Sequence, residues 1–492
     1  MQRHGGRYSR RFAFPAAALG LLAVITIVGS EVAARVAKQF VCDGRGPAPF
    51  VPHSEFGWTH EAGVEFFSYG CLGRRYEYKV PVRINSKGLR DNEHDFARSA
   101  DRSRVLVLGD SVTEAGQVAL EEAFTERLES QLTSAGLPTE VINAGHAAFS
   151  TENELLYFRH EGRRYSPDVV MVVVNLANDI AENSTETRDA LYAGALHLPK
   201  AITTFNSDGT LAFDTRPFRD FKVEVARQRA SAGSVAKTIR SNLYLYRWLE
   251  RRLDSETAEQ KAPPPDRIAF LEHMFRPSAS PAWSLAYHLT ETLIRQLVND
   301  IRASGSLPLI VLVPSARMVA PDRPHEALGL ASDSDVQYPA RRLAQHLRTL
   351  DTAFVDVAPR MRGAYERTGR TGFYEFDVHP TGRGHRIIAR AIRPSLASLV
   401  RVKVDSDLLP GSDGAAGPFP WRGLLTTAAA AKEHWTPGAL GSALTFSGPR
   451  KNDPQPCAQQ LPAADLLRIT PHARRAADCP VHPFRGFRSL GR

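Results

Sequence analysis

Five short runs of mainly apolar residues, separated by segments of helix length, constrain the fold of this chain more than any other feature. Three of them, VLVL (105–108), VVMVVV (169–174) and LIVLV (309–313), contain no polar side chain. A strand of this kind must be buried on both faces, as in a parallel sheet that helices cover on both sides. With EVIN (140–143) and AFVDV (353–357), the runs predict an α/β fold, a doubly wound five-stranded parallel sheet.

Apolar residues between these runs recur at helical spacing. Phe124, Leu128 and Leu132 lie four residues apart, and their segment ends at Gly136, a residue type that commonly terminates helices. We expect amphipathic helices of this kind to cover the two faces of the sheet.

The alternation of strands and helices covers residues 104–403 and is interrupted by an insertion at 181–280. Residues 41–103 are rich in aromatic side chains and predict an irregular N-terminal extension with a few short strands. Residues 404–492 are rich in Pro, Gly and Ala without periodicity, so we expect a disordered tail.

The N-terminal segment, residues 1–40, carries a membrane signal. Four arginines among the first eleven residues precede an uncharged apolar stretch from Phe12 to Ser30. About 20 apolar residues cross a bilayer as a helix, and positive residues stay on the cytoplasmic side. We therefore predict a single-pass transmembrane helix in the inner (cytoplasmic) membrane, with the catalytic domain outside the cytoplasm. The alternative is a cleaved signal peptide, which would release a secreted protein.

The four cysteines are compatible with export. Cys42 and Cys71 follow the apolar stretch and could form a disulfide in an oxidising compartment, with two unpaired thiols as the alternative. The spacing of these two and of Cys457 and Cys479 does not match a zinc site, so no metal is predicted.

The formal net charge of +9 raises the question of an anionic partner. The basic residues are scattered, and none forms a block interleaved with aromatic side chains, so the sequence argues against nucleic-acid binding. Nothing in the sequence indicates an oligomeric state.

Polar residues gather where the predicted strands end. The first strand is followed by residues 109–111 (GDS), the second by 143–146 (NAGH) and the third by 175–179 (NLAND), while Asp377 and His379 follow the last strand. In an open parallel sheet, ligands bind beyond the carboxyl ends of the strands. A hydroxyl, several hydrogen-bond donors and an acid–imidazole pair are therefore expected at one edge.

This set of groups is what acyl transfer from an ester requires. A serine hydroxyl becomes a nucleophile when an imidazole takes its proton, and a carboxylate fixes the imidazole tautomer. The tetrahedral intermediate also needs preorganised donors near its oxygen, such as a backbone N–H or an asparagine amide.

Four segments in this order resemble the sequence blocks of the SGNH (GDSL-type) hydrolase family: GDSVTEAG (109–116), NAGHAAFST (143–151), LANDI (176–180) and DVHPTGRGH (377–385). The upstream stretches GWTH and RINSKGLRDNE are similar to those of membrane-anchored or exported bacterial members. The resemblance covers roughly residues 105–400 and implies the flavodoxin-like fold of that family.

The resemblance also implies roles for individual residues. Ser111 would be the nucleophile, His379 the base and Asp377 the acid that orients it. The oxyanion hole would combine the N–H groups of Ser111 and Gly145 with the side-chain amide of Asn178. The family usually places the acid three residues before the histidine, where this chain has Phe376, so Glu375 remains an alternative to Asp377. No metal or organic cofactor is implied.

We therefore expect an exported serine esterase that hydrolyses ester groups, O-acetyl groups above all, on a carbohydrate of the cell envelope. One alternative is an O-acyltransferase that uses the same residues and passes the acyl group to a sugar hydroxyl. Another is a non-catalytic envelope protein that binds carbohydrate.

Overall fold

The computed structural model describes residues 8–40, 42, 49–72, 75–192, 198–231, 243, 265–277, 280–321 and 334–407. The predicted tail at 404–492 lies outside the described residues, except for 404–407, which belong to the last helix. The predicted insertion at 181–280 is described in part.

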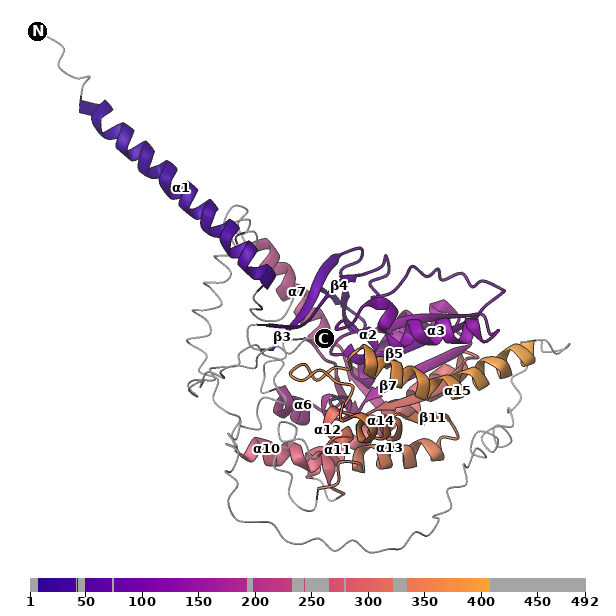
Figure 1. Ribbon diagram of the computed structural model, residues 1–492. Helices are drawn as coiled ribbons and strands as arrows, with labels where there is room; N and C mark the ends of the chain where they lie inside the picture. The colour runs from indigo at the N-terminus through magenta and orange to yellow at the C-terminus, as the bar shows by residue number, and fades with distance from the viewer. Residues whose placement is uncertain are drawn as a thin grey trace, which may run out of the picture.

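A five-stranded sheet with the strand order β11-β10-β7-β5-β6 forms the centre of the molecule (Figure 1). Every neighbouring pair in it is parallel, which confirms the predicted fold class. All residues of β5, β7 and β10 are buried, as the apolar runs 105–108, 169–174 and 309–313 within these strands require. The strands are β5 (Ser103–Gly109), β6 (Thr139–Gly145), β7 (Val169–Asn175), β10 (Leu307–Val313) and β11 (Ala353–Asp356).

The strand order changes direction at β5. From β5 the chain moves to β6 on one side, and then returns to β7 on the other side of β5. The connections after β5 and β7 therefore diverge, an arrangement that in such sheets leaves room for a ligand between the carboxyl ends of the two strands. This topological switch point is where a ligand site is expected in such a sheet.

Helices cover both faces of the sheet, as the amphipathic pattern predicts. Alternate strand residues point to opposite faces, so Leu106 and Leu108 belong to one core cluster, and Val105 and Val107 to the other. Phe124, Leu128 and Leu132 are buried together in the second cluster. The first face is covered by α4 (Thr151–His160), α11 (Pro281–Ala303) and α13 (Tyr338–Thr349), and the second by α3 (Phe124–Ser134), α14 (Ala358–Thr368) and α15 (Gly382–Asp407).

The segment 41–103, expected to be largely irregular, contains two antiparallel hairpins. One pairs β1 (Phe50–His53) with β2 (Gly57–His60), and the other pairs β3 (Glu65–Leu72) with β4 (Arg75–Arg83). A disulfide joins Cys42 to Cys71 of β3, with 5.5 Å between their Cα atoms. It links the hairpin to the chain just after the first helix, α1.

The inserted segment between β7 and α11 has secondary structure of its own. The turn at 206–210 connects the antiparallel strands β8 and β9. The elements described here are α5 (Asp179–Glu182), α6 (Thr185–Tyr192), β8 (Ile202–Phe205), β9 (Leu211–Asp214), α7 (Arg216–Ser231) and α10 (Pro265–Glu272). Shorter helical turns elsewhere are α2 (Ser111–Glu114), α12 (Ala316–Val319), and 3-10 turns at Leu120–Glu122, Gly162–Tyr165 and His273–Phe275.

Helix α1 (Tyr8–Phe40) projects from the rest of the molecule (Figure 1). Its stretch Ala18–Val36, with a mean hydropathy of 1.8, is long and apolar enough to cross a membrane. A signal sequence has the same length, composition and position, so the helix is equally compatible with an anchor and with a signal peptide.

Candidate active site

Ser111 lies at the sharp turn where β5 becomes α2. Asp110 is the N-cap of this short helix, and its Oδ1 accepts a hydrogen bond from the N–H of Val112 at 2.8 Å. Its Oδ2 accepts from Nδ2 of Asn175, at the end of β7, also at 2.8 Å. Asp110 is fully buried, and this burial raises the pKa of its carboxyl group. The carboxyl group thus ties the turn that carries Ser111 to the neighbouring strand.

Of the three residues predicted to act together, His379 lies between the other two and contacts both Ser111 and Asp377. The Nε2 atom of His379 is 2.7 Å from Oγ of Ser111, across 268 positions of the chain. On the other side of the ring, Nδ1 of His379 contacts Oδ1 of Asp377. Glu375, the alternative acid, is exposed, and its backbone N–H contacts Glu77 instead. The structure therefore brings Asp377, not Glu375, to the imidazole.

The loop that carries Asp377 is held by strand β4 of the N-terminal extension. The phenol of Tyr78 donates to Oδ2 of Asp377 at 2.9 Å. The carboxylate of Glu77 accepts from the N–H of Asp377 at 2.8 Å and from that of Phe376 at 3.0 Å. Burial raises the pKa of Glu77, although these hydrogen bonds oppose the shift.

No sequence motif indicates a role for Glu77 and Tyr78 in the site. The alternating pattern around them predicts a strand, and this is correct, but a pattern along one strand carries no information about a loop 299 positions away. The only signal was the presence of an aromatic-rich extension before the sheet domain.

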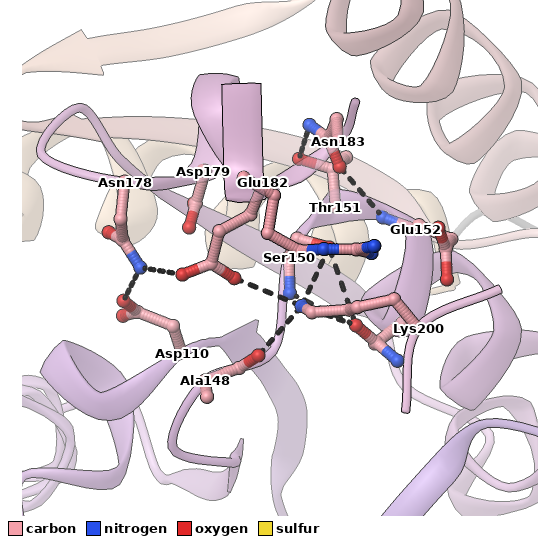
Figure 2. A network of polar contacts seen from close by, with 12 residues as sticks. Asp110, Ala148, Ser150, Thr151, Glu152, Asn178, Asp179, Glu182, Asn183 and Lys200 are labelled. Carbon is pink, nitrogen blue, oxygen red and sulfur yellow. Dashed lines mark hydrogen bonds and ion pairs between the residues drawn. The ribbon is translucent and has the colours of Figure 1, made fainter. Parts of the chain in front are cut away.

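Two of the expected oxyanion donors, Ser111 and Asn178, follow the ends of β5 and β7. The N–H of Ser111 has no acceptor among the described residues. Nδ2 of Asn178 donates to Oε1 of Glu182 at 2.7 Å and lies 3.3 Å from Oδ2 of Asp110 (Figure 2). Both groups lie at the switch point of the sheet.

Gly145 requires a correction. Its N–H donates to Oδ1 of Asn143 at 3.0 Å, so this donor is already used within the chain. The glycine is needed for packing, because a Cβ here would lie 2.4 Å from the backbone nitrogen of Glu114 and 2.7 Å from the carbonyl carbon of Thr113. Gly145 thus allows the end of β6 to approach the helical turn that carries Ser111.

The loop after β6 presents a different backbone donor. Ala148 has a φ of 63°, in the left-handed region that an alanine seldom adopts, and it is partly exposed. No acceptor for its N–H occurs in the part of the chain that the structure describes. The preceding N–H, that of Ala147, contacts the carboxylate of Glu114. A left-handed residue with a free N–H beside a ligand site is a typical anion-binding geometry.

Two buried histidines near the site are neutral at physiological pH. Burial lowers the pKa of His146 to about 3, and burial together with the neighbouring Arg90 lowers the pKa of His385 to about 3. Neither residue contacts Ser111. No group of three or more His, Cys, Asp or Glu side chains that could hold a metal ion occurs among the described residues.

The family to which the chain belongs follows from a comparison with protein-family models. Residues 107–387, more than half of the chain, match the model of the GDSL-like lipase/acylhydrolase family. No curated protein matches the sequence. Among solved structures, the chain is similar to TesA (12% identity, 60% of this chain and 99% of that chain, TM-score 0.32). It is also similar to a variant of Axe2, an acetyl xylan esterase from Geobacillus stearothermophilus (12%, 61% and 97%, 0.31), and to the acetyl xylan esterase AlAXEase (10%, 60% and 99%, 0.32). On the family match, the chain belongs to the GDSL-like lipase/acylhydrolase family and is a hydrolase acting on ester bonds.

Proposed function

We propose that this chain is an exported serine esterase, anchored in the cytoplasmic membrane by α1, that hydrolyses O-acetyl esters on a carbohydrate of the cell envelope. The observation that carries the catalytic part is the 2.7 Å contact between Nε2 of His379 and Oγ of Ser111. The contact of Nδ1 with Asp377 places the ring proton on Nδ1, so that Nε2 can accept the serine proton.

In the acylation step, Nε2 of His379 takes the proton from Ser111 as Oγ attacks the ester carbonyl carbon. Asp377 stabilises the imidazolium that forms. The imidazolium then gives the proton to the oxygen of the leaving alcohol, the carbon–oxygen bond of the ester breaks, and the acyl group remains on Ser111.

In the deacylation step, His379 takes a proton from a water molecule as the water oxygen attacks the acyl-serine carbonyl. The second tetrahedral intermediate collapses, its carbon–oxygen bond to Ser111 breaks, and the imidazolium returns the proton to Oγ. The products are the free carboxylic acid and the original enzyme.

Three donors are proposed for the oxyanion: the N–H groups of Ser111 and Ala148 and the side-chain amide of Asn178. Both backbone groups are without acceptors among the described residues, so they are available to a ligand. The side-chain amide of Asn178 has two N–H groups. One is held by Glu182 at 2.7 Å, and the other, which makes the longer contact of 3.3 Å with Asp110, would turn to the substrate. Removing one such donor typically costs about 3 kcal/mol of transition-state stabilisation.

The proposed location supports the choice of substrate. Ala18–Val36 could anchor the chain, and the Cys42–Cys71 disulfide is of the kind that persists in oxidising compartments outside the cytoplasm. An ester on an envelope carbohydrate is the class of substrate that such a position makes accessible.

The test of the catalytic proposal is hydrolysis of p-nitrophenyl acetate by the full-length chain in detergent. We expect kcat to fall at least a thousandfold in Ser111→Ala and in His379→Ala. The controls are Ser130→Ala on α3 and His288→Ala on α11, two exposed residues that we expect to be replaceable without loss. Full activity in folded Ser111→Ala would contradict the proposal.

The substrate proposal needs a separate test. We expect the wild-type chain to release acetate from an O-acetylated polysaccharide, and Ser111→Ala to release none. Addition of an acceptor sugar distinguishes hydrolysis from transfer. If acetylated acceptor forms in place of free acetate, the proposed hydrolysis is wrong, and the chain is an acyltransferase.

A further inference from the structure

Lys200, in the segment inserted after β7, reaches the switch point of the sheet from outside the four sequence blocks. Its side chain is fully buried, and Nζ has four oxygen acceptors within 3.0 Å. These acceptors are the carbonyl oxygen of Ala148 (2.7 Å), Oδ1 of Asn153 (2.8 Å), Oγ of Ser150 (3.0 Å) and Oε2 of Glu182 (3.0 Å). A buried ammonium with this many partners holds them in fixed positions.

One line of contacts runs from Lys200 to the amide of Asn178. Nζ pairs with Oε2 of Glu182, and Oε1 of the same carboxylate accepts from Nδ2 of Asn178 at 2.7 Å (Figure 2). Glu182 is one α-helical turn after Asn178, so the two side chains lie on the same side of α5. Two groups therefore hold the carboxylate that orients the amide: Lys200 at Oε2, and the hydroxyl of Tyr192 at Oε1.

A second line of contacts runs from Lys200 to the loop after β6. The ammonium binds the carbonyl of Ala148, and also Oγ of Ser150 two residues later (Figure 2). The left-handed φ of 63° at Ala148 is unfavourable for an alanine, so something must hold it. The ammonium, together with the contact of the Ala147 N–H to Glu114, provides this support.

The ammonium of Lys200 lies in a region with several buried carboxyl groups. Asp110, Glu154, Asp179 and Glu182 are all buried in this region, and Lys200 forms an ion pair with one of them, Glu182. Burial raises the pKa of Glu154 and Asp179 well above the ordinary range, and nearby carboxylates add to the effect. Without the ammonium, an ionised Glu182 would be an unpaired buried charge.

The backbone around Lys200 is fixed to the same helix that follows the loop. The N–H of Ala201 donates to Oε1 of Glu152 at 2.7 Å, and the hydroxyl of Thr203 donates to Oε2 at 2.9 Å. Glu152 belongs to α4, which begins directly after Ser150. These two contacts fix the backbone next to Lys200 against the start of α4.

We propose that Lys200 is a positioning residue that sets two of the three oxyanion donors. It sets the amide of Asn178 through Glu182, and it sets the N–H of Ala148 by holding the carbonyl oxygen on the other side of the same Cα. This inference rests on the proposed esterase function. It assigns a role in catalysis to the inserted segment, which supplies no residue to the four sequence blocks.

The test uses kcat per active site, counted by titration with a fluorophosphonate, so that a partly unfolded sample does not lower the result. We expect Lys200→Met to lower kcat tenfold to a hundredfold with KM changed less than about twofold, because donors used mainly in the transition state are misplaced. Lys222→Met, an exposed lysine of α7 in the same inserted segment, is the matched control and should keep the wild-type kcat.

The pair variant Lys200→Met/Glu182→Gln separates the two lines of contact, because it removes the charges of Lys200 and Glu182 together. Its glutamine oxygen can still accept from Asn178, so we expect kcat to recover to about tenfold below wild type, the remaining loss coming from Ala148. In an Asn178→Ala background, Lys200→Met should cost clearly less than it does in the wild type, because one of its targets is gone.

The outcomes distinguish this inference from the proposed function. If the wild-type chain shows neither ester hydrolysis nor labelling of Ser111, the proposed function is wrong. If the wild type is active and folded Lys200→Met retains its kcat, only the inference about Lys200 is wrong. If Lys200→Met does not fold, the pair variant decides: a kcat equal to that of the wild type overturns the inference. If Lys200→Met lowers kcat by the same factor in the Asn178→Ala background as in the wild type, Lys200 does not act on Asn178 through Glu182.

Discussion

The phenolic hydroxyl of Tyr78 donates a hydrogen bond of 2.9 Å to Oδ2 of Asp377, between residues 299 positions apart. The contact joins the N-terminal hairpin to the acid that we propose orients His379. It stabilises the ionised carboxylate, and it directs the other oxygen, Oδ1, toward the imidazole.

Tyr78→Phe removes this hydrogen bond and keeps the ring. We expect kcat for p-nitrophenyl acetate to fall about tenfold, or about 1.4 kcal/mol, with KM nearly unchanged. In an Asp377→Asn background the same substitution should cost little, because its effect passes through the carboxylate. Equal losses in the two backgrounds would mean that Tyr78 acts on something else.

Glu77 holds the backbone of the same loop. Glu77→Ala removes the acceptor of the N–H groups of Phe376 and Asp377, so we expect kcat to fall about tenfold and the loop to become more sensitive to protease. Glu77→Gln keeps one acceptor oxygen and should lie between the wild type and the alanine variant. If the glutamine variant is as impaired as the alanine variant, the charge of Glu77 matters more than its geometry.

Gly145 is required by packing in the structure. In Gly145→Ala the new Cβ would lie 2.4 Å from the nitrogen of Glu114, so the turn that carries Ser111 must shift. We expect a loss of about 3 kcal/mol in the free energy of unfolding, together with a loss of activity. Gly363→Ala, in helix α14, meets only the end of Arg367 and should be neutral or slightly stabilising. Urea unfolding monitored by fluorescence measures both, and a Gly145→Ala variant as stable as wild type would contradict the packing role.

The buried His385 predicts a specific pH dependence of stability. Its folded-state pKa of about 3 lies below the ordinary value of 6.5, mainly because of burial, so the unfolded chain binds a proton that the folded chain does not. The stability that results is complete above pH 6.5 and is lost as the pH falls toward 3. Between pH 7.5 and pH 5 the loss from this histidine is roughly 2 kcal/mol.

His385→Phe tests this effect. The ring stacks on Phe124 with 5.9 Å between centroids, and neither ring nitrogen has a partner among the described residues, so a phenylalanine loses no hydrogen bond. We expect the unfolding free energy of the variant to fall by roughly 2 kcal/mol less than that of the wild type between pH 7.5 and pH 5. The same pH dependence in both proteins would show that His385 does not titrate on unfolding in this range.

Much of the fold and of the site geometry follows from local pattern. The strands at 105–108, 169–174 and 309–313 lack polar residues, so burial on both faces, and with it a parallel sheet, is nearly forced. Once the sheet is parallel, the polar residues directly after each strand must share one edge, which is why Ser111 and Asn178 could be expected there. His379 follows β11 only after helix α14, so its contact with Ser111 was expected from the family resemblance and not from the sheet.

Sequence patterns could not predict the contacts that segments outside the central sheet make with the site. The hairpin of Tyr78 and the inserted segment of Lys200 are not strands of the central sheet, so its topology does not determine where they dock. The error at Gly145 has a related cause. A glycine at a strand end fits both a backbone donor and a close approach of two chains, and only the contact with Asn143 distinguishes them.

The most direct test of the central claim is to find where a fluorophosphonate reacts with the full-length chain. Peptide mass spectrometry should locate a single phosphonyl adduct on Ser111, formed only in folded protein and formed at least a hundredfold more slowly in His379→Ala. An adduct on another residue, or hydrolysis of p-nitrophenyl acetate that continues unchanged when Ser111 is replaced by alanine, would show that Ser111 is not the nucleophile.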